Sequence, residues 1–346
     1  YADFSARSCL IFPAQDNGGQ VDLYVNSMVR TVTTNEEGKA TGVSFINKED
    51  RTEYKLKAKV VVLAASACSS ARILLNSKSE QHPNGLGNSS DVVGKYLHDS
   101  TGGGRMAFLP ELVDRKIYNE DGVGGMHVYS PWWLDNKNLN FPRGYHIEVW
   151  GGMGAPSYGS GFNVNDLNKF FGIKVGGYGD MLRTDMRKYY GTVLGMDGRG
   201  ESIAMESNYC EIDPDKVDEF GVPVLRFNYK WSNHEVNQAK HMQDTFEEII
   251  HNMGAIALGD KPGKDRNYGL TKPGEIIHEV GTTRMGSDPK TSVVNEFEQL
   301  HDVSNVFVVD AGPFVSQADK NPTWTIMALA WRTSDYIVDQ FKKQNF

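Results

Sequence analysis

Residues 305–311 read Asn-Val-Phe-Val-Val-Asp-Ala, and this stretch decides which fold the sequence predicts. Its unbroken apolar run is typical of a strand buried on both faces, and Asp310 follows it where parallel sheets place their ligands. A similar run at 60–63 leads into the elbow Ala64-Ala65-Ser66 and a helix pattern at 69–75 that begins with serines, which favour caps. A strand, a tight elbow and a helix are the parts of a nucleotide-binding α/β layer.

The rest of the chain carries clear periodicities on both sides of this stretch. Alternation with period two predicts strands at 21–25, 28–32, 42–46, 54–58, 204–211 and 222–229. Apolar spacing predicts helices at 234–253 and 322–341, the second with an inward stripe of Ile326, Leu329, Ala330, Thr333 and Ile337. The glycines at 102–104 are expected to form a loop.

The order of these elements predicts an α/β protein, α+β overall, with a discontinuous nucleotide-binding domain. We expect residues 1–104 and 278–346 to form that domain, and residues 105–277 to form an inserted antiparallel-sheet domain. The inserted part is rich in aromatic residues, Gly and Pro and has weak helical periodicity over most of its length. This arrangement suits a cofactor domain covered by a substrate-binding domain.

Composition excludes several classes of protein. The formal net charge of −8 and the lack of a Lys/Arg run argue against a nucleic-acid partner. The longest apolar runs are too short for a transmembrane segment. Three scattered cysteines form neither a CxxC pair nor a disulfide framework, and the sequence predicts no metal site.

Two residues near the C-terminus are the candidates for catalysis. His278 precedes a small-residue turn, and imidazole is suited to take a proton near neutral pH, although a lone histidine also serves as a local structural residue. Asn321 precedes Pro322, so it is either a plain helix cap or an amide that binds a substrate oxygen beside His278. His98 and His146 are weaker candidates, for which a structural role is the expectation.

Residues 278–286, 305–311 and 321–325 together resemble the C-terminal signature of the glucose-methanol-choline (GMC) family of FAD-dependent oxidoreductases. The resemblance implies that His278 takes the hydroxyl proton, that the hydride goes to flavin N5, and that Asn321 binds the substrate oxygen. It further implies FAD contacts for Val29 at the adenine, for Ala65 and Ser66 beside the ADP moiety, for Asp310 and Ala311 at the ribityl and pyrophosphate groups, and for Asn321, Pro322 and Thr323 at the flavin ring. Ser66 stands where relatives often carry Gly.

Within that family the ending is most similar to the branch of gluconate dehydrogenase flavoproteins, pyranose oxidases and glucoside dehydrogenases. This implies a sugar or polyol substrate, with oxygen, a quinone or a cytochrome as possible electron acceptors. A non-catalytic carbohydrate-binding remnant of the same fold is the alternative, and a flavin-using lyase is a third reading. Periplasmic and cytoplasmic locations both remain open.

No G-x-G-x-x-G fingerprint follows a strand near the N-terminus. In dinucleotide-binding folds this loop and its helix hold the pyrophosphate. The sequence therefore predicts a Rossmann-like layer that lacks its N-terminal βαβ unit, as in a truncated or partial gene product. FAD binding by such a chain alone is expected to be weak or absent.

Overall fold

A computed structural model describes residues 5–116, 128–130, 138–151 and 178–346 of this protein. The strands are β1 (Ser27–Thr34), β2 (Ala40–Asn47), β3 (Glu53–Lys57), β4 (Val61–Leu63), β5 (Thr101–Phe108), β6 (Val128–Ser130), β7 (Tyr145–Gly151), β8 (Val193–Gly200), β9 (Tyr209–Val217), β10 (Pro223–Asn228), β11 (Ile256–Leu258) and β12 (Val306–Val308). The α-helices are α1 (Phe12–Asp16), α2 (Ala67–Asn76), α4 (Asp180–Tyr189), α5 (Asn233–Asn252) and α6 (Thr323–Lys342), with short helical turns at Arg7–Ile11, Pro110–Leu112 and Lys264–Gly269.

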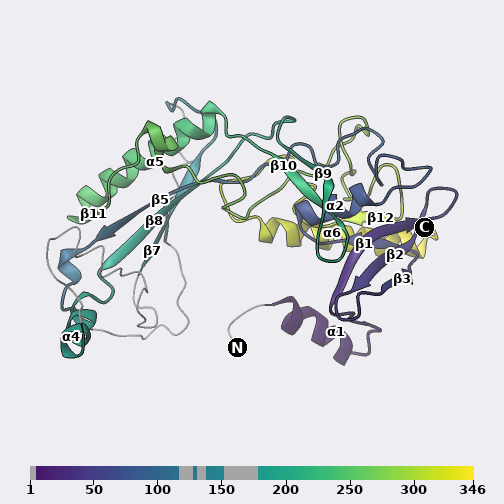
Figure 1. The fold of residues 1–346 in the computed structure, drawn as a ribbon, viewed down its shortest axis with the longest axis horizontal. Helices are drawn as coiled ribbons and strands as arrows, with labels where there is room; N and C mark the ends of the chain where they lie inside the picture. The colour runs from purple at the N-terminus through teal and green to yellow at the C-terminus, as the bar shows by residue number, and fades with distance from the viewer. Residues whose placement is uncertain (1–4, 117–127, 131–137, 152–177) are drawn as a thin grey trace.

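Figure 1 shows these elements in two groups, with β5, β7, β8, β11 and α5 at one end and β1–β3, α2, α6 and β12 at the other. The combination of helices with parallel and antiparallel strands makes the protein α/β overall. The domain boundaries at 104 and 278 stay a prediction.

A three-stranded antiparallel sheet, β1-β2-β3, confirms the strands expected between 28 and 58. The strand expected at 21–25 is wrong, because that segment is irregular and pairs with no strand of the described chain. Its apolar side chains remain in solvent, with Leu23 exposed to 62% and Val25 to 67%. Alternation alone does not make a strand where no neighbouring strand supplies backbone partners.

The parallel pair of β4 and β12 forms the expected α/β layer. Val61 pairs with Val306 and Leu63 with Val308, and α2 follows β4 directly. The expectation of burial on both faces is confirmed for β12, whose residues are all buried. It is wrong for β4, since Val62 is 46% exposed and within the described residues only one face of this strand is packed.

Asn305 joins this layer to the neighbouring β1-β2-β3 sheet. Its side-chain oxygen accepts the backbone N–H of Ala40 at 3.1 Å, and its amide donates to the carbonyls of Ala40 at 2.8 Å and Lys59 at 3.0 Å. The residue is 5% exposed; its two bonds with Ala40 are buried and the bond with Lys59 is partly buried. One side chain therefore satisfies backbone groups that would otherwise be buried without partners.

The second group is a five-stranded antiparallel sheet in the order β11-β5-β8-β7-β6, and α5 packs across β5 and β8. Helix α5 confirms the helix expected at 234–253, and it begins with a capping box between Ser232 and Glu235. The glycines at 102–104 are wrongly assigned to a loop, because they lie inside β5. A Cβ on Gly102 would collide with the Ile276 side chain, so close packing explains this glycine.

The antiparallel hairpin of β9 and β10 confirms the strand pairing expected between 204–211 and 222–229, although β9 begins at Tyr209. It packs against α2, and its Cys210 belongs to the same buried cluster as Leu74 and Val306. The chain between the two groups therefore returns to the α/β layer before α5.

Helix α6 confirms the helix expected at 322–341 and places the expected stripe inward, with Thr333 buried. The opposite face of α6 is exposed to solvent, with Trp324 exposed to 87% and Trp331 to 75%. None of the helices in the described ranges combines the length and the apolar content that a bilayer crossing requires.

Replacing Asn305 with Ala should lower the free energy of unfolding by about 3 kcal/mol, because two buried backbone groups and one partly buried backbone group lose their partner. Urea unfolding followed by circular dichroism measures the change. The exposed Asn17 caps only a local turn, so Asn17→Ala is a control that should cost under about 1 kcal/mol. Equal losses in the two variants would contradict the role given to Asn305.

Candidate active site

A cavity of about 660 Å³ lies where the ends of β4 and β12 meet the starts of α2 and α6. Segments far apart in the chain supply its lining: Ser66, Ala67, Cys68, Leu97, Phe227, Tyr229, Pro273, Gly274, Glu275, Ile277, His278, Glu279, Asp310, Ala311, Pro322, Thr323 and Ile326. Five residues named from the sequence as cofactor contacts line it: Ser66, Asp310, Ala311, Pro322 and Thr323. The carboxyl ends of two parallel strands thus open into one cavity, as in other α/β folds.

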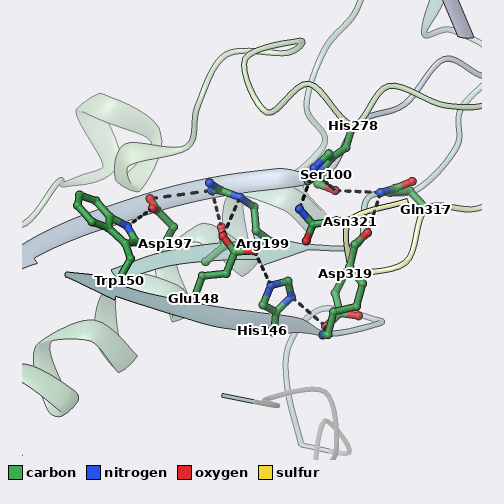
Figure 2. Close-up of polar contacts among 12 residues, drawn as sticks. Ser100, His146, Glu148, Trp150, Asp197, Arg199, His278, Gln317, Asp319 and Asn321 are labelled. Atoms are coloured by element: carbon green, nitrogen blue, oxygen red, sulfur yellow. Dashed lines mark hydrogen bonds and ion pairs between the residues drawn. The ribbon is translucent and has the colours of Figure 1, made fainter. Parts of the chain in front are cut away.

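His278 lies on the wall of this cavity and is half-buried. Its Nε2 is 3.3 Å from Nδ2 of Asn321, and its Nδ1 is 3.3 Å from Oγ of Ser100 (Figure 2). Burial lowers the pKa of His278, and the positive charge of Arg199 lowers it further. The imidazole is therefore neutral near pH 7 and able to take up a proton.

The Asn321 side chain contacts His278 and does not cap the helix. Helix α6 begins at Thr323 with Pro322 as its N-cap residue, and no side chain caps it. The expectation of Asn321 at the N-cap and Pro322 at the first helical position is therefore wrong by one residue. The amide of Asn321 is left to face the imidazole.

Two functional candidates escape the sequence analysis. Ser100 is fully buried and contacts the imidazole, and Gln317 donates its Nε2–H to Ser100 Oγ at 3.2 Å. Neither residue lies in a motif, and Ser100 is 178 positions away from His278. The only local signal is that Ser100 follows the His98-Asp99 pair just before β5.

The backbone of Ser66 adopts a conformation typical of glycine, with φ +82° and ψ 157°. The helix expected at 69–75 is confirmed but begins earlier, at Ala67, so Ser69 and Ser70 lie inside it and do not cap it. Its N-cap residue is Ser66, whose hydroxyl donates to Ser69 Oγ and not to the helix backbone. The first N–H groups of α2 thus remain available at the cavity. Ser66 therefore keeps a glycine-like backbone conformation at the elbow, and this conformation is strained for a residue that has a Cβ.

Asp310 follows β12 and links the end of this strand to helix α2. Its Oδ2 accepts the Ser70 hydroxyl at 2.5 Å, and its Oδ1 accepts the Gly312 N–H at 2.8 Å. Burial raises the pKa of Asp310, and these hydrogen bonds act in the opposite direction. The carboxylate faces the cavity as an acceptor next to the start of α2.

Three cofactor candidates do not line this cavity: Asn321, which contacts the lining residue His278, and Val29 and Ala65. Val29 lies in β1 beside a register irregularity and packs against the buried cluster of the α/β layer. Ala65 lies in the elbow, where its N–H donates to Ser70 Oγ at 3.2 Å. Both stay predictions as adenine or ADP contacts.

His98 is a buried structural residue. It forms a two-way backbone pair with Val280, and its Nδ1 lies 2.7 Å from the Tyr96 carbonyl. Gly281 follows this pair with φ +95°, and a Cβ there would collide with the Tyr96 carbonyl oxygen. Burial lowers the pKa of His98 to about 4, so the ring is neutral in the folded protein.

His146 also has a structural environment. It lies in β7, fully buried, with Nε2 at 3.1 Å from Glu148 Oε1 and Nδ1 at 3.3 Å from Asp319 Oδ2. Burial lowers its pKa, but the hydrogen bonds to Asp319 and Glu148 outweigh burial, so the net shift is upward. Asp319 stands two residues before Asn321, so His146 ties this sheet to the loop that carries Asn321 (Figure 2).

Comparison with known proteins assigns both ends of the chain to one family. Residues 3–101 match the N-terminal model of GMC oxidoreductases, and residues 206–330 match the C-terminal model. Together these matches span well over half of the chain.

Similarity to individual proteins extends over most of the chain. A 2-methyl-1,2-propanediol dehydrogenase from Mycolicibacterium austroafricanum is 31% identical over 92% of this chain and 55% of its own length. A gluconate 2-dehydrogenase flavoprotein from Pantoea cypripedii is 28% identical over 96% of this chain and 53% of its own length. The crystal structure of pyridoxine 4-oxidase from Mesorbium loti superposes with a TM-score of 0.60 at 16% identity, over 90% of this chain and 57% of that chain. The chain thus spans about half the length of these relatives.

Ser66→Gly should raise the free energy of unfolding by about 1 kcal/mol, because relief of backbone strain exceeds the extra entropy of glycine in the unfolded chain. Urea unfolding measures the change. Ser69→Gly, inside α2, is the matched control and should be destabilising by about 1 kcal/mol. A loss of stability in Ser66→Gly as large as in the control would contradict the strain at this position.

His98 should make the protein less stable in mild acid. Its folded pKa of about 4 lies below the ordinary 6.5, so only the unfolded chain binds a proton as the pH falls through that interval. Between pH 7.5 and 5, wild type should lose about 2 kcal/mol more stability than His98→Gln. Asp99, whose pKa burial raises to about 6, contributes with the opposite sign, and the comparison with the variant removes its contribution. Parallel pH profiles for the two proteins would rule out this titration of His98.

Proposed function

The chain belongs to the GMC oxidoreductase family, and on that basis we propose that it oxidises a CH–OH group of a sugar or polyol with FAD as the cofactor and His278 as the base. The observation that carries the proposal is the contact at 3.3 Å between Asn321 and His278, the second of which lines the cavity. The two side chains come from segments 43 residues apart, and each would otherwise have served only a local structural role.

The lining of the cavity fits part of FAD. The starts of α2 and α6 both open into it without a side-chain cap, so their free N–H groups and positive dipole ends favour an anionic or electron-rich group. The carboxylate of Asp310 would accept hydrogen bonds from hydroxyl groups of the cofactor. Ser66, Asp310, Ala311 and Thr323 are the residues that we expect to hold it. When bound, FAD supplies the acceptor for the hydride that leaves the substrate carbon.

His278 and Asn321 have different roles toward the substrate hydroxyl. The neutral Nε2 of His278 takes the hydroxyl proton, because burial keeps the imidazole unprotonated near pH 7. The Asn321 amide, which has no useful basicity, donates Nδ2–H to the substrate oxygen and orients it. Proton transfer therefore depends on His278 alone.

The helix start beside Asn321 adds an electrostatic contribution. The N–H groups near Thr323 and Trp324 have no intrahelical partners, and the α6 dipole makes this end of the cavity positive. Negative charge that develops next to Thr323 during the reaction would be stabilised there.

The antiparallel sheet next to His278 is proposed as the substrate-binding domain, inserted into the cofactor domain as the sequence predicts. Glu148, Asp197 and Arg199 on β7 and β8 lie on the same side of the sheet as His278 and Asn321 (Figure 2). Such charged and amide groups suit a substrate with many hydroxyl groups. The relatives named as propanediol and gluconate dehydrogenases support a polyol or sugar.

A non-catalytic remnant is not favoured, because it would not need a neutral histidine held against an amide at the cavity. The electron acceptor, whether oxygen, a quinone or a cytochrome, stays a prediction. A flavin-using lyase would turn over without net reduction of an added acceptor, and that measurement separates it from the proposed oxidoreductase.

The function is tested with the FAD-loaded protein under anaerobic conditions, with a panel of aldopyranoses, gluconate and short diols. Loss of the visible flavin absorbance on mixing supports the proposal and identifies the substrate class. A flavin that stays oxidised with every polyol while an acceptor-independent elimination proceeds would favour the lyase.

His278→Ala should slow flavin reduction by roughly a hundredfold or more, because no other group takes the hydroxyl proton. Stopped-flow absorbance with saturating substrate measures the rate. His251, exposed at the end of α5, gives the control variant His251→Ala, which should reduce at the wild-type rate. An unchanged rate in His278→Ala would remove the role proposed for this residue.

A further inference from the structure

The backbone of His278 is held by the segment 98–100. His98 and Val280 exchange backbone hydrogen bonds of 3.1 and 2.8 Å, so the two segments run antiparallel. Asp99, which is fully buried, accepts the His278 N–H with Oδ1 at 2.9 Å and the Ser100 N–H at 2.8 Å. These contacts place Ser100 next to the imidazole ring.

Both ring nitrogens of His278 have a polar neighbour. On the Nε2 side, Nδ2 of Asn321 lies at 3.3 Å, and an amide nitrogen only donates hydrogen bonds. With the Asn321 amide in this orientation, Nε2 presents its lone pair and the proton of the neutral ring is on Nδ1. The hydroxyl oxygen of Ser100, 3.3 Å from Nδ1, accepts that proton in a hydrogen bond.

Gln317 acts on the far side of Ser100. The Gln317 side chain is 1% exposed, and its Nε2 donates both to Ser100 Oγ at 3.2 Å and to the Lys320 carbonyl at 3.3 Å. A carbonyl oxygen only accepts, so the contact with Lys320 sets which end of the amide faces Ser100. The donated hydrogen bond engages one lone pair of Oγ and leaves the other for Nδ1–H of His278.

We propose that Ser100 and Gln317 are positioning residues that hold His278 as the Nδ1–H tautomer, so that Nε2, which Asn321 faces when no substrate is bound, carries the lone pair that takes the substrate proton. The significance of this tautomer for catalysis rests on the function proposed above for His278. Deprotonated Nε2 is the atom that receives the substrate proton, so a ring protonated on Nε2 is inactive until it exchanges tautomers.

The same contacts align the two halves of the catalytic pair. Gln317 and Asn321 lie on one loop, and this loop is also fastened to β7 through Asp319 and His146 (Figure 2). Lys320 contacts Asp319 at 2.5 Å and compensates its charge. Ser100 begins the path into β5, so His278, Asn321 and the antiparallel sheet are joined by continuous hydrogen bonds.

The tautomer is measured directly by nitrogen NMR of protein labelled with 15N-histidine, at a pH where His278 is neutral. The chain has nine histidines, and His278→Gln assigns the signals of interest. We expect the protonated nitrogen to be Nδ1 in the wild type. Ser100→Ala should shift the Nδ1–H to Nε2–H ratio at least about fivefold toward Nε2–H, since one hydrogen bond is lost. Gln317→Leu should shift it in the same direction, and Ser100→Thr should restore the wild-type ratio.

The controls are a second serine–histidine pair and a second buried glutamine. Ser292 Oγ lies 2.9 Å from Nε2 of His301, so Ser292→Ala should change the His301 signals and leave those of His278 in place. Gln243 is fully buried against Gly103 and Gly269, so Gln243→Leu matches the volume change of Gln317→Leu. A shift of His278 in the controls as large as in the two test variants would overturn the proposal.

Two further results would refute it: protonation of Nε2 in the wild type, or an unchanged tautomer in both Ser100→Ala and Gln317→Leu. The measurement needs neither substrate nor turnover. A wild-type Nδ1–H that Ser100→Ala removes, in a protein that oxidises no sugar or polyol, would therefore support the positioning role and count only against the proposed function.

Discussion

The parallel pairing of β4 with β12 is the contact on which the candidate site depends. It joins residues 61–63 to residues 306–308 and points the carboxyl ends of both strands to the same edge. The elbow at Ser66 and the carboxylate of Asp310 therefore meet, and the Ser70–Asp310 hydrogen bond holds them together. Bringing β4 and β12 together costs conformational entropy, because a long stretch of chain separates them. The burial of β12 and the hydrogen bonds of Asn305 offset this cost.

A second pairing connects this layer to the antiparallel sheet. The segment 98–100 runs beside 278–280 and continues directly into β5, so one short stretch both holds His278 and begins the neighbouring sheet. A base at such a junction touches the cavity on one side and faces the sheet on the other. In this way the groups that would bind a cofactor and those that would bind a substrate converge on one imidazole.

Burial gives the site its protonation states. It lowers the pKa of His278 and raises that of Asp310, so the cavity pairs a neutral base with a carboxyl group held by hydrogen-bond donors. The uncapped starts of α2 and α6 place positive dipole ends at the same cavity. An arrangement of this kind suits chemistry in which a proton and a hydride leave the substrate in different directions.

Sequence reasoning succeeded where the deciding physics is local. Helical spacing predicts α5 and the apolar run predicts β12, and the structure confirms both, whereas the roles inferred from the residue types of His278 and Asn321 stay predictions. It failed where a partner decides the outcome. The 21–25 segment alternates correctly but has no strand beside it, and Gly102 reads as a loop residue although Ile276 leaves room only for glycine in β5.

The sequence by itself therefore determined the family of this protein and those of its elements that have a clear periodicity, because periodicity and signature residues act over a few positions. Only the tertiary structure decided that Asn321 faces the imidazole rather than capping α6, that Ser66 takes a glycine-like backbone, and that Ser100 and Gln317 contact the His278 network. The contacts among these side chains join residues up to 217 positions apart that meet only after packing, and no local sequence pattern predicts such contacts.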